Sequence, residues 1–325
     1  MARRDEKSAV MSAAASTASD RAECPICGPQ SSTLVGTSNS LPVVQCVGCD
    51  LMYVATSSSS SSMSDTQDFF REEYIKDNKH AQVAYVDYRK KSLEREASRI
   101  RRLMPNGGRL LDVGTASGFF LRQFQEDREW QVEGVEPSKV SVEFARQEFG
   151  LTVHEGFLAD QHFPSSSYDV LCSLDAFICH RQPREDMREF YRVLAPGGLL
   201  AIEIPGHRFR MMTGSGLLYR TLTGRSLRLN AGVNFYYYTR ATLTRLAANA
   251  GFEFIESHPE SMPATGNRLT QLAREAYNFA AAGLYRATNG HWNFSAKEMC
   301  IFRKPVAQSP AVPSTAPLTV GRRAA

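Results

Sequence analysis

The sequence lacks the features that mark membrane and secreted proteins. None of its 325 residues belong to an apolar run near the roughly 18–20 residues that cross a bilayer. Residues 1–22 contain no continuous apolar segment of the kind that directs secretion, so we predict a disordered arm there. Seven cysteines, four of them in two C-x-x-C pairs, suit a reducing cytosol with a bound metal better than a disulfide framework. We therefore predict a cytoplasmic protein without a membrane span.

Acidic residues are absent from one long stretch, and a strong charge excess is absent from the whole chain. A net charge of +4 is too small to indicate a nucleic-acid partner. No Asp or Glu occurs between Ile204 and Gly251, and the arginines of that stretch are Arg208, Arg210, Arg220, Arg225, Arg228, Arg240 and Arg245. Arginine binds carboxylate and phosphate groups through paired hydrogen bonds. We predict a lid at about 205–235 over an anionic ligand; the alternative is a solvated loop whose arginines pair with acids elsewhere.

Composition and periodicity divide the chain into five parts. Residues 1–22 and 305–325 are rich in Ala, Ser, Pro and Thr and are predicted to be disordered. A cysteine module at 23–54 is followed by a serine-rich linker at 55–67. The remaining region, 68–304, begins with a charged helical pattern and then alternates between strand and helix patterns.

The strand patterns of the long region predict one sheet. They lie at 109–114, 131–136, 151–154, 168–174, 198–204, 252–257 and 298–303. Helical stretches fall between several of them, such as 138–149 and 184–194. Alternation of this kind predicts an α/β fold, a doubly wound and largely parallel sheet of seven strands covered on both faces, with a small N-terminal cysteine lobe.

Two matched cysteine pairs predict a structural metal site. Cys24 and Cys27 stand in "CPICG", and Cys46 and Cys49 stand in "CVGCD", with eighteen residues between the pairs. Each C-x-x-C turn can present two thiolates to one tetrahedral Zn²⁺, and the spacer can form a β-ribbon. Four thiolates leave no open coordination position, so this zinc would be structural. The alternative is four unrelated buried thiols. Three other cysteines in apolar surroundings are predicted core residues: Cys172, Cys179 and Cys300.

A glycine-bearing turn follows the first strand of the long region. The stretch "RLLDVGTASGFF" places Gly114 and Gly118 on either side of three small residues. Glycines serve where the backbone takes unusual dihedral angles or lets a ligand approach closely. A phosphate-binding P-loop would need a lysine after the second glycine, and a dinucleotide site would need G-x-G-x-x-G; the stretch has neither. We therefore expect a different nucleoside ligand.

Four ordered motifs resemble those of class I S-adenosylmethionine-dependent methyltransferases. They are "LLDVGTASGFFL", "VEGVEPS", "YDVLCSLDAFICH" and "VLAPGGLLAIEIP", all within residues 105–303. The double C-x-x-C segment and the tyrosine-bearing stretch at 72–91 are similar to those of bacterial small-molecule and sugar methyltransferases with an N-terminal zinc-binding segment. The resemblance implies transfer of a methyl group from S-adenosylmethionine to O or C of a small-molecule acceptor.

The resemblance also implies how the turn region holds S-adenosylmethionine. Backbone amides of the turn would meet the methionine carboxylate and the nucleoside; the turn residues concerned are Gly114, Thr115, Ala116 and Gly118. Asp112, at the end of the first strand, would orient the methionine end. Glu136, at the end of the second strand, would accept hydrogen bonds from both ribose hydroxyls.

Four more residues are implied at the edges of this site. Phe157 and Leu158 would adjoin the adenine, or else pack in the core. Tyr85 would begin the helix that covers the cofactor, or else staple that helix to the core. Asp175 would face the methionine amine or the acceptor.

Two histidines are candidates for the base that removes a proton from the acceptor. In the relatives a Glu-His pair follows the fourth strand; here His180 matches the histidine, and Cys179 stands where Glu is expected. Histidine suits proton removal near neutral pH. A histidine at a strand end can also cap the next helix, so both roles stay open for His180. His207, in "IPGHRF", is the second candidate.

Two alternative functions remain beside the small-molecule enzyme. One is methylation of ribosomal or transfer RNA, against which stands the lack of a lysine-rich patch. The lack of an N/D-P-P-Y/F motif makes methylation of a base amino group a poor fit. The other is a non-catalytic S-adenosylmethionine-binding scaffold whose zinc module recruits a partner, which the Cys179 departure favours.

Overall fold

The computed structural model describes residues 23–55, 79–212, 229–261 and 268–306. The predicted linker beyond residue 55 and most of the predicted lid lie outside these ranges. Residues 79–88 are described by their backbone alone.

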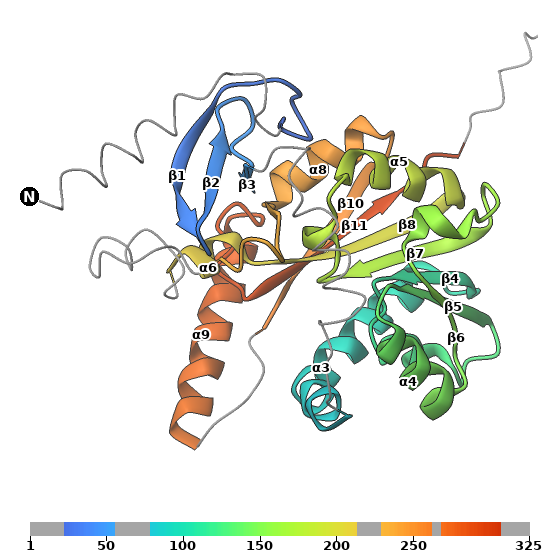
Figure 1. The fold of residues 1–325 in the computed structure, drawn as a ribbon. Coiled ribbons are helices and arrows are strands. Elements are labelled where there is room, and N and C mark those ends of the chain that lie inside the picture. The colour runs from blue at the N-terminus through green and yellow to red at the C-terminus, as the bar shows by residue number, and fades with distance from the viewer. Residues whose placement is uncertain (1–22, 56–78, 213–228, 262–267, 307–325) are drawn as a thin grey trace, which may run out of the picture.

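A mixed sheet of seven strands forms the centre of the molecule, as predicted (Figure 1). Its order is β10-β11-β8-β7-β4-β5-β6. The strands are β4 (Gly108–Val113), β5 (Trp130–Glu136), β6 (Thr152–Glu155), β7 (Tyr168–Leu174), β8 (Leu194–Pro205), β10 (Glu253–Glu260) and β11 (Lys297–Arg303). Five neighbouring strands of this order, β8, β7, β4, β5 and β6, run parallel to one another. Strand β11 is antiparallel to both β8 and β10.

The strand order reverses between β4 and β7. The chain runs outward from β4 through β5 to β6, then returns to the other side of β4 as β7 and continues to β8. In doubly wound sheets, ligands bind at the carboxyl ends of the strands where the order reverses. The glycine-bearing turn after β4 lies at this position.

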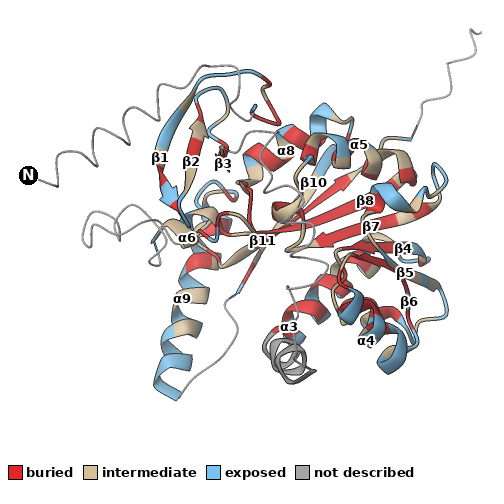
Figure 2. Cartoon of the chain, viewed as in Figure 1, coloured by how far each residue is buried: buried red, intermediate tan, exposed pale blue. Residues whose placement is uncertain are grey.

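Helices cover both faces of the sheet. On one face, α3 (Lys79–Leu103) and α4 (Lys139–Phe149) pack with the short helix η2 (Leu121–Phe124). On the other face lie α5 (Pro183–Val193) and α8 (Arg240–Asn249). Figure 2 shows the central strands as largely buried, while the far end of α9 (Arg268–Ala287) is exposed. The apolar positions Leu93, Ala97 and Ile100 of α3 are buried against the sheet, as their spacing predicts.

The cysteine segment forms a β-ribbon, as expected, but it does not pack as a separate module. Strands β1 (Ser32–Ser38), β2 (Leu41–Cys46) and β3 (Met52–Val54) pair antiparallel, and β9 (Tyr236–Tyr237) adds a fourth strand from far along the chain. Its buried residues Cys24, Leu51 and Tyr53 share one core with α5 and α8. The predicted boundary at residue 54 therefore marks a change in composition and not an edge of the core. We call residues 23–55 with β9 the cysteine lobe.

The described end of the predicted lid packs against the cysteine lobe. Leu229, Ala231 and Phe235 are buried beside Val43 and Met52 in a small core of their own. At the start of the same segment, α6 (His207–Met212) directly follows β8. The described parts of the segment thus lie at the end of β8 and against the cysteine lobe, while residues 213–228 of the predicted lid lie outside the described residues.

Candidate functional site

The turn after β4 requires glycine at two positions. Gly114 has φ +78° and Gly118 has φ +77°, a left-handed conformation that residues with a side chain rarely adopt. A Cβ atom at Gly114 would overlap the Ala176 methyl group, and one at Gly118 would lie 2.6 Å from Leu151 Cδ1. Between them Ala116 takes φ +49°, which costs a residue with a side chain about 1–2 kcal/mol. Close packing between the turn and its neighbours therefore explains why the motif has glycine at these two positions.

The amides of this turn serve the protein itself. Gly114 and Thr115 both donate to the Val135 carbonyl, at 2.8 and 3.2 Å. The Gly118 amide donates to the Thr115 carbonyl at 3.0 Å, and the Ala116 amide donates to Glu136 Oε2 at 2.9 Å. Each of these four amides thus has an acceptor within the chain, and the expectation that the turn also meets the methionine carboxylate and nucleoside stays a prediction.

Glu136 is a buried carboxylate held in place by two backbone amides. It is the last residue of β5 and is 5% exposed. Besides the amide of Ala116, the amide of Ser138 donates to its Oε1 at 2.9 Å. Burial raises the pKa of Glu136 to about 7, against the effect of these two hydrogen bonds. Because each carboxylate oxygen can accept more than one hydrogen bond, the group keeps acceptor capacity for a diol.

Three buried polar atoms near the turn have no hydrogen-bond partner among the described residues. They are Asp112 Oδ1, Thr115 Oγ1 and Asp175 Oδ1; the Asp112 and Thr115 side chains are neighbours, and their contact lowers the Asp112 pKa against the effect of burial. Asp112 lies near the carboxyl end of β4 and is 2% exposed, and burial raises its pKa to about 7. Asp175 follows β7 directly, across the point where the strand order reverses. Buried polar atoms in native proteins are nearly always paired, so unpaired oxygens gathered at one edge fit a ligand with a donor group. S-adenosylmethionine, with its ammonium group and ribose diol, matches this set together with Glu136.

A buried charge network next to this site was not foreseen from the sequence. Arg89 of α3 pairs with Glu203 at 2.6 Å and Glu96 at 3.1 Å, and it lies 3.7 Å from Asp175. Lys297 of β11 pairs with both Asp175 and Glu203. These partners come from elements far apart in sequence, so spacing alone gave no signal for them. Asp175 thus pairs with this network through Oδ2, while its Oδ1 lies among the unpaired oxygens near the turn.

Three further residues expected at the cofactor have different surroundings. Leu158 is 4% exposed and belongs to the main core, which favours the core-packing alternative for it. Phe157 is half-buried, and its amide donates to Asp160 Oδ2 at 3.2 Å. Tyr85 lies in α3, but its side chain is outside the described residues.

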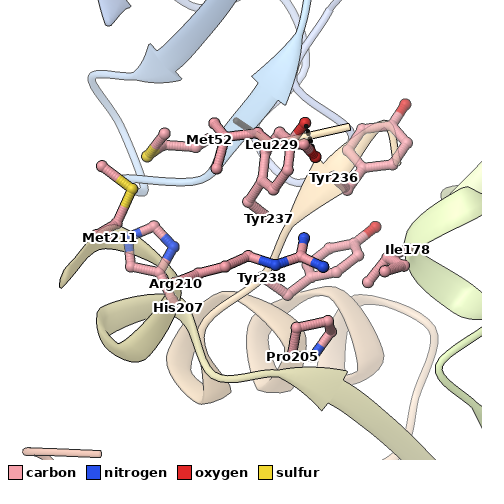
Figure 3. A pocket seen from close by; sticks show the side chains of 10 residues that line it. All are labelled: Met52, Ile178, Pro205, His207, Arg210, Met211, Leu229, Tyr236, Tyr237 and Tyr238. Atoms are coloured by element: carbon pink, nitrogen blue, oxygen red, sulfur yellow. Dashed lines mark hydrogen bonds between the residues drawn. The ribbon is translucent and has the colours of Figure 1, made fainter. Parts of the chain in front are cut away.

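A small pocket lies beyond the ends of β7 and β8, against the cysteine lobe (Figure 3). Ile178 follows β7 and Pro205 ends β8. The residues lining this pocket are Met52, Ile178, Pro205, His207, Arg210, Met211, Leu229, Tyr236, Tyr237 and Tyr238. It combines side chains of the lobe, of α6 and of the loop after β7.

The two candidate histidines differ in position. His180 Nδ1 lies 3.0 Å from Asp186 Oδ2 in the first turn of α5, and its ring packs on Phe177 and Phe190. His207 lines the pocket, where burial and two nearby arginines lower its pKa below the ordinary value. A hydrogen bond to the Tyr237 backbone opposes that shift. The pocket therefore contains a neutral imidazole from His207, whereas His180 is turned to α5.

The arginines of the acid-free stretch have several different partners. Arg210 lines the pocket, while Arg208 is exposed and lies over the Phe294 ring at 5.9 Å. Arg240 donates to the Asn289 carbonyl at 2.8 Å, and Arg245 donates to the Gly48 carbonyl at 3.1 Å. Three more lie outside the described residues: Arg220, Arg225 and Arg228. Among the described ones, Arg210 alone lines the pocket.

The four paired cysteines form one cluster. The sulfur atoms of Cys24, Cys27, Cys46 and Cys49 all lie within 4.8 Å of one another, and those of Cys24 and Cys49 are 3.5 Å apart. Tetrahedral zinc with Zn–S bonds of about 2.3 Å places its sulfur ligands about 3.8 Å apart, so the donor set fits this metal. Helices α5 and α8 hold the two knuckles by contacts to their backbone carbonyls: Arg184 to Pro25 and Cys24, Asn249 to Ile26, and Arg245 to Gly48.

The three other cysteines are not part of this cluster. Cys172 and Cys300 are fully buried in the core, as predicted. Cys179 is partly buried, and its thiol lies 3.6 Å from Asn234 Oδ1.

Comparison with known proteins identifies the family of this chain. The model of a family described as a methyltransferase domain matches residues 85–257. Sarcosine/dimethylglycine N-methyltransferase from Aphanothece halophytica is 30% identical over 162 residues, which are 47% of this chain and 54% of that protein. The uncharacterized methyltransferase YdaC of Bacillus subtilis (strain 168) is 24% identical over 100 residues, 30% of this chain and 55% of that protein. The chain thus spans about half the length of these curated relatives.

Among solved structures, a Haemonchus contortus phosphoethanolamine N-methyltransferase 2 in complex with S-adenosyl-L-methionine is 18% identical, with a TM-score of 0.48. The alignment covers 78% of this chain and 63% of that one. In the described part of the chain, no helix is both long and apolar enough to cross a membrane.

Proposed function

This chain belongs to the methyltransferase-domain family, and we propose that it is an S-adenosylmethionine-dependent methyltransferase that acts on an oxygen or carbon atom of a small-molecule acceptor. The observation that carries the proposal is the group of buried, unpaired oxygens beside Glu136 at the ends of β4, β5 and β7. The Aphanothece relative is named for a small-molecule substrate, which supports the size of the acceptor but not the atom methylated.

The cofactor site is proposed to work through fixed carboxylates. Glu136 would accept the two ribose hydroxyls, since its orientation is already set by the amides of Ala116 and Ser138. Asp112 and Asp175 would receive the methionine ammonium group at the oxygens that lack partners. Pairing with a cation favours the ionised form of a buried carboxyl group. The positive charge of the ligand would therefore offset the cost of ionising Asp112.

The acceptor chemistry is proposed to involve His207 rather than His180. His207 lines the pocket as a neutral ring, the form that accepts a proton. His180, by contrast, faces Asp186, an arrangement that supports the capping alternative. S-adenosylmethionine supplies the methyl group already activated, so the chain's own residues need only align the acceptor, exclude water and take its proton.

The acceptor is also proposed to be anionic. Arg210 lies in the pocket, and no lining residue is acidic. The structural zinc proposed for the cysteine cluster would hold the two knuckles against α5 and α8 and would take no part in the transfer. A four-thiolate site has no position left for a substrate.

Calorimetry with S-adenosylhomocysteine tests the cofactor site. Glu136→Ala should weaken binding about 100-fold or more, because two hydrogen bonds to a charged group are lost. Glu155→Ala is the matched control: Glu155 pairs with Glu136 in the register of β5 and β6 but is exposed, so its affinity should stay within twofold of wild type. No binding by the wild-type protein, or equal affinity in Glu136→Ala, would contradict the site. A screen with methyl-labelled S-adenosylmethionine then identifies acceptors.

A further inference from the structure

We infer that two copies of this chain associate through α9, each copy packing one apolar stripe of the helix against the same stripe of the other. The stripe consists of exposed residues spaced three and four apart: Leu269, Leu272, Ala273, Ala276, Phe279, Ala280 and Gly283. Residues with this spacing share one face of a helix, which we call the outer stripe. The inference goes beyond the proposed function, and none of the residues proposed for the cofactor belongs to α9.

The opposite side of α9 attaches the helix to the rest of the protein. Ala281 and Tyr285 are buried there. The Tyr285 hydroxyl donates to Glu298 Oε1 of β11 at 3.0 Å, and the Tyr277 hydroxyl donates to the Phe294 carbonyl at 2.7 Å. Figure 1 shows the helix extending from this attachment away from the sheet. The contacts on one side therefore leave the outer stripe facing away from the protein.

The apolar side chains of α9 are distributed in the reverse of the usual way. A surface helix normally turns its large apolar residues to the core and its polar residues to water. In α9 the exposed fractions are 76% for Leu269, 63% for Leu272 and 82% for Phe279. Figure 2 shows the far end of the helix as exposed. Large apolar side chains in one row form a patch, and such patches mark interaction sites, whereas single exposed apolar residues are ordinary.

The order of large and small residues along the outer stripe is complementary to itself. In an antiparallel pair of α9 helices with the two-fold axis at Ala276, residues equally far from Ala276 in the two copies lie level with one another. Each level pair joins a large residue to a small one: Leu269 with Gly283, Leu272 with Ala280, and Phe279 with Ala273. Two helices pack closely when the side chains of one fit the gaps of the other. A lipid surface would place no condition on this order, so the match favours a second copy.

Gly283 is the position that this pairing explains best. It lies inside a helix, where glycine is less stable than alanine. Its φ is not left-handed, and a Cβ atom added there would have no described atom within 4 Å. Neither backbone conformation nor packing among the described residues therefore requires glycine. In the antiparallel pair, Gly283 leaves room for the Leu269 side chain of the second copy.

The size of the outer stripe suits a weak dimer. From Leu269 to Gly283 the helix rises about 21 Å, at 1.5 Å per residue. Two stripes of this length would bury on the order of 1,000 Å² in total, which is the lower limit for a specific interface. We therefore expect a dimer with a dissociation constant of about 10 µM.

Sedimentation equilibrium over about 1–200 µM tests the dimer. Leu272→Glu should weaken association at least about 100-fold, because the pair would bury a carboxylate without a partner. Leu34→Glu is the matched control: Leu34 of β1 is also 63% exposed but lies outside α9, so this variant should associate within about twofold of wild type. Urea unfolding of each variant in dilute solution checks that it is folded.

Gly283→Leu tests the antiparallel order. The added side chain would occupy the space that receives Leu269 of the second copy, so association should weaken at least about tenfold. The dilute monomer should lose no stability in urea, because the position is open and leucine forms helix better than glycine. In a parallel pair, by contrast, Gly283 would lie level with itself, and leucine there would strengthen association.

Three results would overturn the inference. The first is a wild-type protein that remains monomeric at about 200 µM, and the second is equal association of wild type and Leu272→Glu. The third is stronger association of Gly283→Leu, which would contradict the antiparallel pair. If monomeric wild type also sediments with phosphatidylcholine–phosphatidylserine vesicles and Leu272→Glu does not, the outer stripe binds lipid instead of a second copy.

Discussion

The cofactor edge and the cysteine lobe are built in different ways. At the cofactor edge, one continuous stretch from Leu110 to Gly118 supplies both the strand and the turn, and Glu136 follows on the neighbouring strand. In the lobe, the strand that follows the second cysteine knuckle, β3, pairs with a strand from far along the chain, at Tyr236–Tyr237. The first region depends on backbone conformation and the second on long-range pairing. The two regions should therefore respond differently to substitution.

The largest effect is expected in the lobe. Cys46→Ser removes one of four thiolates from a cluster whose buried members belong to the main core. Binding of structural zinc is coupled to folding, so we expect zinc content to fall from one per chain to none and unfolding to cost about 4 kcal/mol less. Mass spectrometry of bound metal and calorimetric unfolding measure both.

Cofactor binding by Cys46→Ser is the control, because the cofactor edge does not depend on the cysteine cluster. Among the described residues, the hydrogen-bond partners of Glu136 are Ala116 and Ser138, outside the lobe. Cys46→Ser should therefore bind S-adenosylhomocysteine within tenfold of wild type at a temperature where it is folded. Unchanged zinc content and unchanged stability would show that the four sulfur atoms are an ordinary part of the core.

A smaller loss of stability is expected from a substitution in the turn. Unlike the lobe variant, the turn variant should also lose cofactor affinity. Gly114→Ala places a methyl group on Ala176 in a left-handed conformation, so we expect a loss of about 3 kcal/mol in stability and a large loss of cofactor affinity. Gly150→Ala is the control, since its φ is +64° but nothing lies within 4 Å of the added atom. It should cost only about 1 kcal/mol. Equal losses in the two variants would mean that backbone conformation alone, without the Ala176 contact, accounts for the glycine.

The smallest effect concerns the dependence of stability on pH. Burial raises the pKa of Glu136 from 4.5 to about 7, so the folded protein holds a proton there that the unfolded chain has released. The resulting contribution to stability is complete below about pH 4.5 and is lost as the pH rises to 7. Urea unfolding of ligand-free protein at pH 5 and pH 8 should show wild type losing about 2 kcal/mol more than Glu136→Gln over this range. An identical pH dependence in the two proteins would mean that Glu136 is ionised at pH 5.

Predictions from the sequence were reliable where the relevant residues are neighbours in the chain. The seven strands, the ribbon between the cysteine pairs and the buried face of α3 all follow from periodicity over short windows. The turn was recognised from its glycines, but its four amides proved to be bonded within the protein, because their acceptors come from β5 and from the turn itself. Local patterns predict a turn without showing which of its groups remain available.

Residues whose partners are distant could not be assigned in the same way. Spacing gave no reason to join Arg89, Glu203 and Lys297, which meet only when α3, β8 and β11 pack together. Likewise, the sequence favoured His180 over His207 as the base, and their different surroundings follow from how α5 and α6 lie on the sheet. The arginines looked alike in sequence, yet Arg210 lines the pocket and Arg245 holds a knuckle.

By itself, then, the sequence determined the fold class, the family and the positions of the glycine turn and cysteine pairs, because each is encoded in contiguous residues. Only the tertiary structure decided that the cysteine lobe shares the core of the sheet and forms one wall of a pocket beside the turn. The physical reason is that the pairing of β3 with β9 and the burial of Tyr237 and Tyr238 depend on contacts between segments separated by most of the chain. Such contacts leave no periodic mark in the residues that make them.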